Sequence, residues 1–468
     1  MIIKKLPKVL LLYTLIVFIS CKKNAAQNKT KEQPQQVFLK GKFKDEISED
    51  ALTMINFSKN SLFFEEEFHR IPLDEDQSFT YTFSIDSPGY YAIGRSYLYL
   101  TPGDSLDMIL TEGRKSASFK GKGAEVNNYL TAVTYPKGGS FWGDFRNGSE
   151  NEKITDYKKA PTVFKKILDK RIAHLETLKN APKEFVELEK ARLRFDYVNS
   201  LGNLFYLYIN DVRSGKITQQ DMDNKLEEAA TYFAPHIKEI IGDYNNIKYI
   251  QLEVFQSLLY DLKQEDFIEK HQLVQLNEDL KEYVLTNDLI YGFNNNGYTK
   301  NFITKYKEER KKIKNEDYLL ALDKKESKYA SLMQGNIAPD FELTNLNGET
   351  VKLSDYKGKV IVVDLWATWC GPCMYEKPYF EALEQQYETN DNIILLSVSI
   401  DKKHIWKSYF KKNEVKGHQL QTLSTNLEAY QVASIPRFFV IDKDFKIVDV
   451  FAPVPSSGEL VNIIKTTI

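Results

Sequence analysis

Apolar and polar residues follow two different patterns along this chain, and the change between them divides it into regions. Residues 37–123 have the alternation typical of half-buried β-strands, with polar turns such as Pro102-Gly103 between the strands. In the clearest strand, Ser78–Asp86, one face carries the apolar residues Phe79, Tyr81, Phe83 and Ile85. Several short strands separated by turns predict a small all-β domain, a sandwich or a barrel.

Over residues 124–333 the apolar residues recur with the period of an α-helix. One apolar stripe at helical spacing consists of Phe164, Ile167, Leu168, Ile172, Leu175 and Leu178. Phe195–Ile209 is apolar almost all round, which predicts one central helix. Lys305–Glu316 carries nine charges in twelve residues and is expected to form a solvated helix face. These features predict an all-α region.

Residues 335–468 combine both patterns. Val360–Leu365 and Ile393–Val398 are nearly continuous apolar runs, as expected for strands that are buried on both faces of a sheet. The expected order is a hairpin (Phe341–Leu353), a strand (Val360–Leu365), a helix (Cys370–Glu388), a strand (Ile393–Ile400), a helix (His404–Lys411), two strands (Phe438–Asp442, Lys446–Val450) and a helix (Gly458–Lys465). The predicted fold is therefore multidomain, with an all-β domain, an all-α region and a C-terminal α/β domain with a mixed sheet.

The N-terminus has the pattern of an export signal. Lysines precede an apolar run over Val9–Ile19, which is shorter than the ~20 residues of a membrane-spanning helix. The segment that ends at Cys21 resembles a bacterial lipobox, in which the cysteine is acylated. That resemblance implies a signal peptide over residues 1–20 and a lipid anchor at Cys21. An uncleaved anchor or a soluble exported product is the alternative. Residues 21–36 contain almost no large apolar side chain and are expected to form a disordered tether.

Composition narrows the possible functions. The 468 residues carry 63 Lys and Arg against 65 Asp and Glu, a net charge of −2, so nucleic-acid binding is not expected. The three cysteines are too few for a disulfide scaffold. Two of them, Cys370 and Cys373, are separated by two residues and carry the candidate chemistry.

A dithiol with this spacing can close to a disulfide and reopen. The pair follows a predicted buried strand and begins a predicted helix, whose free N–H groups and positive end favour a thiolate on Cys370. That thiolate can attack a disulfide of another molecule, and Cys373, one turn further on, can then release the reduced product. Gly371 and Pro372 shape the loop; a proline at an early helical position sacrifices no hydrogen bond.

The strand and motif together resemble a known family. Val363–Cys373 (VDLWATWCGPC) is similar to the thioredoxin active site, and Ala338–Phe341 (APDF) and Leu353–Lys359 (LSDYKGK) are similar to the TlpA/ResA branch of envelope thiol–disulfide oxidoreductases. The exit of the β region, Phe119–Tyr129, resembles that of the N-terminal β-domain of many thioredoxin-like envelope lipoproteins.

The resemblance assigns roles to the dithiol and to two carboxylates. Cys370 matches the nucleophile and Cys373 the resolving thiol. Asp364 matches a buried carboxylate beneath the disulfide, whose raised pKa would let it take a proton from Cys373. Glu376 matches a glutamate that tunes the thiols. Because this chain contains both carboxylates, which of them is the working base stays open.

Further family positions are expected around the dithiol. Ile435 and Pro436 match a loop with a cis-proline that faces the disulfide and receives the extended substrate, and Pro378 matches a helix kink. Trp369 is expected to contribute to substrate docking. Arg437 replaces a small polar residue of the family and is expected to bias the charge of partners. Phe445 stands where a turn glycine is common, which leaves the geometry of that turn open.

These residues also allow other interpretations. A zinc site would need two further ligands, which neither Cys21 nor the scattered histidines supply, so no metal is expected. A purely structural disulfide is disfavoured by the strand–turn–helix setting. The peroxidase spacing around Thr368 is absent. Asp364 could be only a polar group at a strand end, and Glu376 only a surface residue.

These inferences lead to one preferred function. The chain is expected to be a lipid-anchored thiol–disulfide oxidoreductase facing the periplasm, which reduces disulfide-bearing envelope proteins. No cofactor is expected beyond the redox-active Cys370–Cys373 pair. The expected electron donor is a membrane thiol carrier. The alternatives are a ligand- or partner-binding lipoprotein with an auxiliary redox domain, or a thiol oxidase or isomerase.

Overall fold

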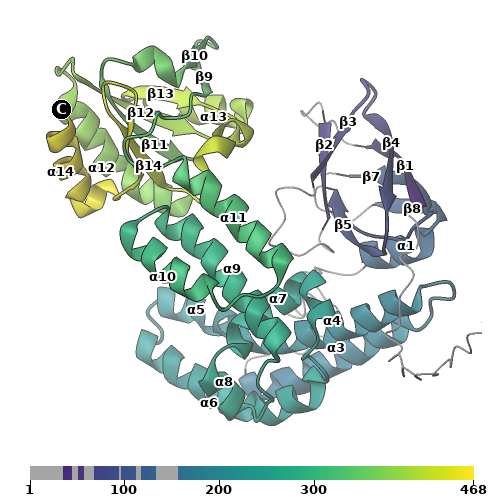
Figure 1. Cartoon of the computed structure of the whole chain (residues 1–468). Helices are drawn as coiled ribbons and strands as arrows, with labels where there is room; N and C mark the ends of the chain where they lie inside the picture. The colour runs from purple at the N-terminus through teal and green to yellow at the C-terminus, as the bar shows by residue number, and fades with distance from the viewer. Residues whose placement is uncertain (1–34, 45–50, 57–67, 94–95, 112–116, 133–155) are drawn as a thin grey trace, which may run out of the picture.

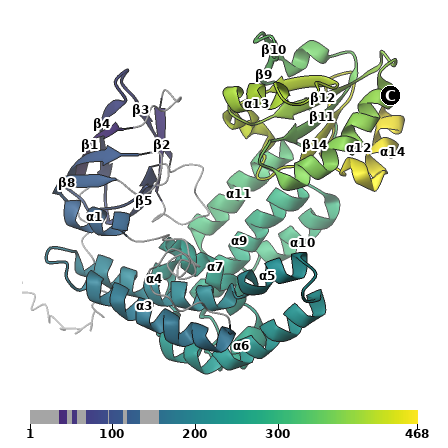
Figure 2. The same cartoon turned by 180° about the vertical axis from the view of Figure 1, so that it is seen from behind.

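The computed structural model describes residues 35–44, 51–56, 68–93, 96–111, 117–132 and 156–468. The predicted signal peptide, Cys21 and most of the tether lie outside these residues. In both views the helical region forms the base of the molecule, and the β-rich and C-terminal domains rise from it at separate places (Figures 1 and 2). The predicted fold class, with all-β, all-α and α/β parts in this order, is confirmed.

The β-rich domain is built from two four-stranded sheets, with the orders β4-β1-β7-β8 and β3-β2-β5-β6. The strands are β1 (Gln35–Phe43), β2 (Ala51–Asn56), β3 (Phe68–Pro72), β4 (Ser78–Ile85), β5 (Gly89–Ile93), β6 (Ser96–Leu100), β7 (Ser105–Leu110) and β8 (Ser118–Lys122). Val37, Leu39, Met54, Leu98 and Met108 are among the side chains that form one buried cluster with members from both sheets. The apolar face predicted for Ser78–Asp86 is confirmed, since Phe79 and Ile85 are buried and the threonines between them are exposed.

Helix α1 (Ala124–Ala132) covers one end of this domain. The side chain of Asn127 pairs with the backbone of Tyr99 on the edge strand β6, accepting from its N–H at 2.9 Å and donating to its carbonyl at 3.0 Å. A buried edge strand needs such partners, because an unpaired backbone group out of water is costly.

A buried charged group joins the β-rich domain to the helical region. Glu189, on α4 (Lys183–Gly202), accepts hydrogen bonds from the hydroxyls of Tyr90 and Tyr129 at 3.3 and 3.2 Å. Arg192 binds both oxygens of the same carboxylate, at 2.8 and 2.6 Å. Glu189 and Arg192 are 0 and 2% exposed, so this joint is shielded from solvent.

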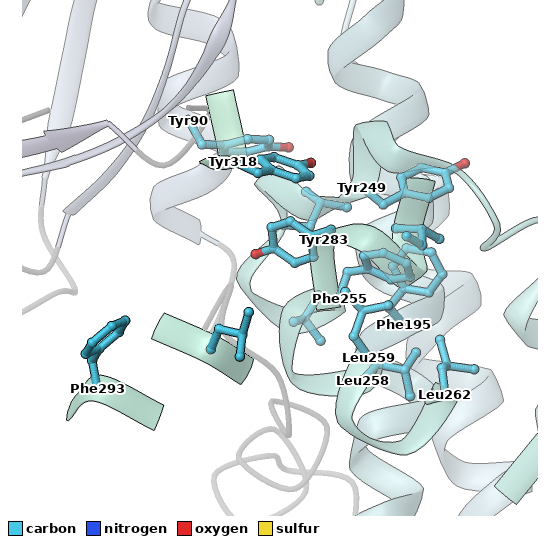
Figure 3. Packing of buried hydrophobic residues seen from close by; sticks show 14 of the residues in the cluster. Tyr90, Phe195, Tyr249, Phe255, Leu258, Leu259, Leu262, Tyr283, Phe293 and Tyr318 are labelled. Carbon is cyan, nitrogen blue, oxygen red and sulfur yellow. The ribbon is translucent and has the colours of Figure 1, made fainter. Parts of the chain in front are cut away.

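The helical region has one group of helices around α4 and a second group further along the chain. Its helices are α3 (Ala160–Leu175), α5 (Phe205–Arg213), α6 (Gln219–Ile241), α7 (Glu253–Leu262), α8 (Glu265–Lys270), α9 (Glu278–Asn296), α10 (Lys300–Arg310) and α11 (Glu316–Ala330), with 3-10 turns at Tyr157–Lys159 and Ile247–Gln251. Figure 3 shows the centre of this packing, where Phe195 of α4 meets Tyr249 and Phe255 with ring centroids 5.1 and 4.8 Å apart.

Two helix predictions in this region were wrong in their extent. The single helix expected over Phe195–Ile209 is broken, because α4 ends at Gly202 and α5 begins at Phe205. Glycine is a poor helix former, and the Asn203 side chain donates to the carbonyl of Asn199 at 2.7 Å, which satisfies a free helix end. The charged stretch Lys305–Glu316 is likewise not one helix but the end of α10, a turn and the start of α11.

The C-terminal domain is a seven-stranded mixed sheet in the order β10-β9-β13-β12-β11-β14-β15. Its elements are β9 (Glu342–Asn345), β10 (Thr350–Lys352), β11 (Val360–Trp366), α12 (Gly371–Tyr387), β12 (Ile393–Ser399), α13 (Lys403–Phe410), β13 (His418–Gln421), β14 (Arg437–Ile441), β15 (Ile447–Ala452) and α14 (Glu459–Thr467), with 3-10 turns at Leu353–Tyr356, Ser424–Tyr430 and Pro455–Ser457. The elements predicted for residues 335–468 are present, and β13 is a strand that the sequence analysis missed.

The two faces of this sheet are covered differently. Helices α12 and α14 cover one face, where Val360 and Val362 pack with Phe380 and Leu460 (Figures 1 and 2). Residues of the other face, such as Val363 and Phe439, belong to the same buried cluster as the helical region. The C-terminal domain and the helical region therefore share a continuous core.

Candidate active site

The central strand β11 leads directly to the dithiol. All seven residues of β11 are buried, and the chain then turns at Ala367–Trp369 into α12. Asp401, two residues after the neighbouring strand β12, holds this turn by accepting from the N–H and hydroxyl of Thr368 at 2.8 and 3.0 Å. Trp369 is 69% exposed beside the dithiol. Sequence reasoning missed Asp401, although a carboxylate directly after a parallel strand next to β11 was a usable signal.

Cys370 and Cys373 form a disulfide, with their Cα atoms 5.3 Å apart. Cys370 is the N-cap of α12, and its Sγ accepts from the backbone N–H of Cys373 at 3.2 Å. A sulfur at this place lies against the positive end of the helix, which stabilises negative charge. The two residues are 5 and 2% exposed, so both are buried in this oxidised form.

The two residues inside the motif leave the helix start unobstructed. Pro372 lies in the first turn of α12. A backbone N–H at this position has no acceptor within the helix, so proline costs no hydrogen bond here. Gly371 is exposed, and a Cβ there would meet no other atom within 4 Å. Its space could hold a side chain, so packing alone does not require glycine at this position.

The peptide bond between Ile435 and Pro436 is cis, and this loop faces the dithiol. The carbonyl oxygen of Ile435 lies 3.7 Å from Sγ of Cys370. Both loop residues are half-buried, so the loop borders the sulfur on one side while Trp369 stands free near it. The predicted positions of Ile435 and Pro436 are thus brought together with the dithiol.

Asp364 lies in β11, six residues before Cys370, and is 4% exposed. Burial raises the pKa of its carboxyl from 3.8 to about 7; the positive charge of Lys377 works against this rise, and the negative charge of Glu376 adds to it. A carboxyl with this pKa can take up or release a proton near neutral pH, as a general base for a thiol requires.

Glu376 is also buried, at 7% exposure, and is not a plain surface residue. Its carboxylate is held by Ser456, whose backbone N–H donates to Oε2 at 3.0 Å and whose hydroxyl donates to Oε1 at 2.8 Å. Glu376 thereby fixes the 3-10 turn Pro455–Ser457 against α12.

Three charged groups on the same helix were not foreseen. Lys377 lies with its Nζ 4.7 Å from the centre of the Trp366 ring and 3.3 Å from Oε1 of Glu381. Glu384, one turn further on, lines a cavity of about 910 Å³, and burial raises its pKa to about 8. Their signal in the sequence was a lysine and two glutamates at helical spacing behind the motif.

Two departures from the family pattern are explained by the structure. Arg437 was expected to bias partner charge, but it is 7% exposed and points into the protein, so that expectation was wrong. Phe445 has a φ of +64°, the left-handed conformation that a turn glycine would supply, and its ring is buried at 6% exposure.

The remaining predicted features concern a metal, a membrane and Cys21. In the part of the chain that the structure describes, no three His, Cys, Asp or Glu side chains are grouped so as to hold a metal ion. No helix within the described ranges is both long and apolar enough to cross a bilayer. Cys21 lies outside the described residues.

Comparison with known proteins identifies the family of the C-terminal domain, which carries the dithiol. The Redoxin family model matches residues 333–466. The thiol-disulfide oxidoreductase ResA of Bacillus cereus (strain ATCC 10987) is 36% identical over 129 residues, which are 26% of this chain and 71% of that protein. ResA of Bacillus subtilis (strain 168) is 33% identical over 122 residues, 26% of this chain and 68% of that protein.

Among solved structures, the thioredoxin domain of a thiol-disulfide oxidoreductase from Bacteroides vulgatus is 26% identical and covers 29% of this chain and 98% of that one, with a TM-score of 0.27. The matches with the two ResA proteins extend over more than two thirds of each. Through its C-terminal domain, this chain belongs to the ResA-type, thioredoxin-like thiol–disulfide oxidoreductases.

Proposed function

We propose that the chain is a membrane-tethered reductase of protein disulfides in the bacterial envelope, with Cys370 as nucleophile and Cys373 as resolving thiol. The observation that carries the proposal is the position of Cys370 at the N-cap of α12, where its Sγ accepts from the N–H of Cys373. A thiolate there is stabilised by the positive end of the helix.

The reaction consists of two thiol–disulfide exchanges. In the first, the Cys370 thiolate attacks one sulfur of a substrate disulfide; a mixed disulfide forms and the other substrate sulfur leaves as a thiolate. In the second, Cys373 loses its proton and attacks Sγ of Cys370, which releases the second substrate sulfur and forms the Cys370–Cys373 disulfide. Two electrons have passed to the substrate, so a dithiol donor must return two electrons and two protons.

Asp364 is the better candidate for the base that takes the proton of Cys373. It is buried in the strand that leads to the motif, and its pKa of about 7 matches that task. Glu376 is committed to two hydrogen bonds from Ser456, which hold its carboxylate in place. In this proposal Asp364 moves the proton, and Glu376 contributes electrostatically and holds the neighbouring turn.

Substrate binding is assigned to the surface around Cys370. Trp369 offers an exposed aromatic face, and the loop at Ile435-Pro436 offers backbone groups beside the sulfur. An extended substrate segment would pair with this backbone, while Gly371 and Pro372 keep the approach open. No cofactor beyond the dithiol is needed for either exchange.

The location in the cell is proposed from the N-terminus. The signal over residues 1–20 and acylation of Cys21 would hold the protein at a membrane through the tether at 21–36, with residues 37–123, 124–333 and 335–468 as the β, helical and redox domains. A membrane thiol carrier would then be within reach as the electron donor.

The test is the reduction of a protein disulfide, such as those of insulin, by the prereduced full chain. Wild type should reduce it, Cys370→Ser should abolish the reaction, and Cys373→Ser should stop at a mixed disulfide that dithiothreitol cleaves. If both variants match wild type in this assay and in cells, the protein acts as a binding lipoprotein and the reductase proposal is wrong. Net formation of disulfides in a reduced substrate would show an oxidase instead.

A further inference from the structure

The residue after the cis-proline connects the redox domain to the helical region. Arg437 donates from Nη2 to the backbone carbonyl of Asn294 on α9 at 3.1 Å and from Nη1 to that of Val450 on β15 at 3.5 Å. Its Cζ lies 3.8 Å from the centre of the Phe451 ring. The guanidinium is therefore bound between two parts of the chain and is not presented to a partner protein.

The other end of the same loop is also bound to the helical region. The hydroxyl of Tyr329, on α11, has two acceptors for its one proton: the side-chain oxygen of Asn294 at 3.0 Å and the carbonyl of Gln431 at 3.3 Å. Lys325, one turn before Tyr329, lies 3.5 Å from the side-chain oxygen of Gln431. Figure 1 shows α11 running up to the C-terminal domain.

The segment between these two attachments borders the dithiol. It runs from residue 432 to Pro436, and its Ile435 carbonyl is the group that lies 3.7 Å from Sγ of Cys370. In β14, Arg437 is paired with Leu365, near the end of the strand that leads to the motif. A shift of α9 or α11 against the redox domain would therefore move the two ends of a short loop in contact with the reactive sulfur.

We propose that Arg437 and Tyr329 are positioning residues, through which the helical region sets the place of the Ile435-Pro436 loop against Cys370. The helical region then has a part in the redox reaction: it holds the loop over the sulfur and presents its backbone to substrate. Only the part of this proposal that concerns substrate rests on the proposed function. The contact between the loop and the sulfur does not depend on that function.

Two substitutions remove the bonds that attach the loop to the helical region, one from the side of the loop and one from the side of the helices. Arg437→Met removes both hydrogen bonds and keeps most of the side-chain length, and Arg437→Lys retains a single donor. Tyr329→Phe removes one hydroxyl and keeps the ring. The matched control is Tyr298→Phe, which removes a hydroxyl that donates to Glu326 at 3.2 Å within the helical region.

The first readout is the rate at which iodoacetamide alkylates Cys370 in the reduced full chain at pH 7, located by mass spectrometry. We expect at least a threefold increase in Arg437→Met and in Tyr329→Phe, because the loop no longer covers the sulfur. Arg437→Lys should fall between Arg437→Met and wild type, and Tyr298→Phe should stay within twofold of wild type. Cys373 should stay slow in all variants, which distinguishes loop release from unfolding.

The second readout is kcat and KM for a protein disulfide. We expect kcat/KM to fall at least fivefold in the two releasing variants, mainly through KM, while their circular dichroism matches wild type. Unchanged alkylation in folded Arg437→Met and Tyr329→Phe would overturn the proposal; if Arg437→Met does not fold, Tyr329→Phe decides alone. A wild-type chain that reduces no protein disulfide would refute the proposed function, and the alkylation rates would still decide this inference.

Discussion

Ser456 binds both carboxylate oxygens of Glu376, one through its backbone N–H and one through its hydroxyl. Glu376 is 7% exposed, so these two hydrogen bonds are largely shielded from solvent. Hydrogen bonds to a buried charged group contribute more to stability than neutral ones, about 1.5–3 kcal/mol each. The turn before α14 is thereby coupled to the helix that carries the dithiol.

Ser456→Ala should therefore lower the free energy of unfolding of the redox domain by about 1.5–3 kcal/mol. Urea unfolding followed by tryptophan fluorescence measures this change, because three of the four tryptophans, Trp366, Trp369 and Trp406, belong to this domain. Ser456→Thr keeps the hydroxyl and serves as control. A loss below about 0.5 kcal/mol in Ser456→Ala would show that the hydrogen bond is not important.

Asp364 should make the stability of the oxidised protein depend on pH. Its pKa rises from 3.8 to about 7 on folding, so the folded protein holds this proton more tightly than the unfolded chain does. Below pH 3.8 the Asp364 carboxyl therefore does not destabilise the fold. Its deprotonation lowers the free energy of unfolding progressively as the pH rises from 3.8 through about 7.

Asp364→Asn should remove this penalty. At pH 8 the variant should be more stable than wild type by up to about 4 kcal/mol, and the difference should vanish near pH 4. The exposed Asp391→Asn is the control and should leave the pH profile of wild type unchanged. A gain in stability that is equal at pH 4 and pH 8 would contradict the explanation by burial.

The same substitution should impair the second exchange of the reaction. Without a base, Cys373 loses its proton more slowly, and a loss on the order of 10²-fold is expected for a missing general base. Rapid acid quenching during insulin reduction should show the mixed disulfide accumulating in Asp364→Asn and not in wild type. If Glu376→Gln accumulates it and Asp364→Asn does not, Glu376 is the working base.

The sequence allowed the fold class and the surroundings of the dithiol to be predicted, because both depend on local patterns. The buried run Val360–Leu365, the cysteine spacing and Pro436 each carry their own signal. The role of Arg437 could not be read in the same way, because its partner Asn294 is 143 residues away and no local pattern records such a contact. Strand β13 was missed because four residues at the sheet interior show no clear period.

The buried pair Glu189–Arg192 should contribute strongly to the helical region. Arg192→Met leaves a buried carboxylate without its counter-charge and should cost about 3–5 kcal/mol. The exposed pair Lys165–Asp169, at 2.6 Å, provides the control, and Lys165→Met should cost less than about 1 kcal/mol. Urea unfolding followed by circular dichroism at a helical wavelength compares them; equal losses would mean that burial of the pair has no influence.

Lipid attachment at Cys21 can be tested by labelling growing cells with radioactive palmitate. We expect the wild-type protein to carry the label and Cys21→Ser to lack it, because acylation needs the cysteine thiol. Cys370→Ser is the matched cysteine control and should remain labelled. A labelled Cys21→Ser protein, or an unlabelled wild type, would contradict the anchor.

The central claim is that Cys370 exchanges bonds with the disulfides of other proteins and that Cys373 completes the exchange. The most direct measurement is to isolate Cys373→Ser from cells under acid quenching and to map its disulfide-linked peptides by mass spectrometry. We predict adducts that join Cys370 to cysteines of envelope proteins and that disappear in the Cys370→Ser, Cys373→Ser double variant. A Cys373→Ser protein whose Cys370 is recovered entirely free, from cells in which wild type reduces disulfides, would contradict the claim.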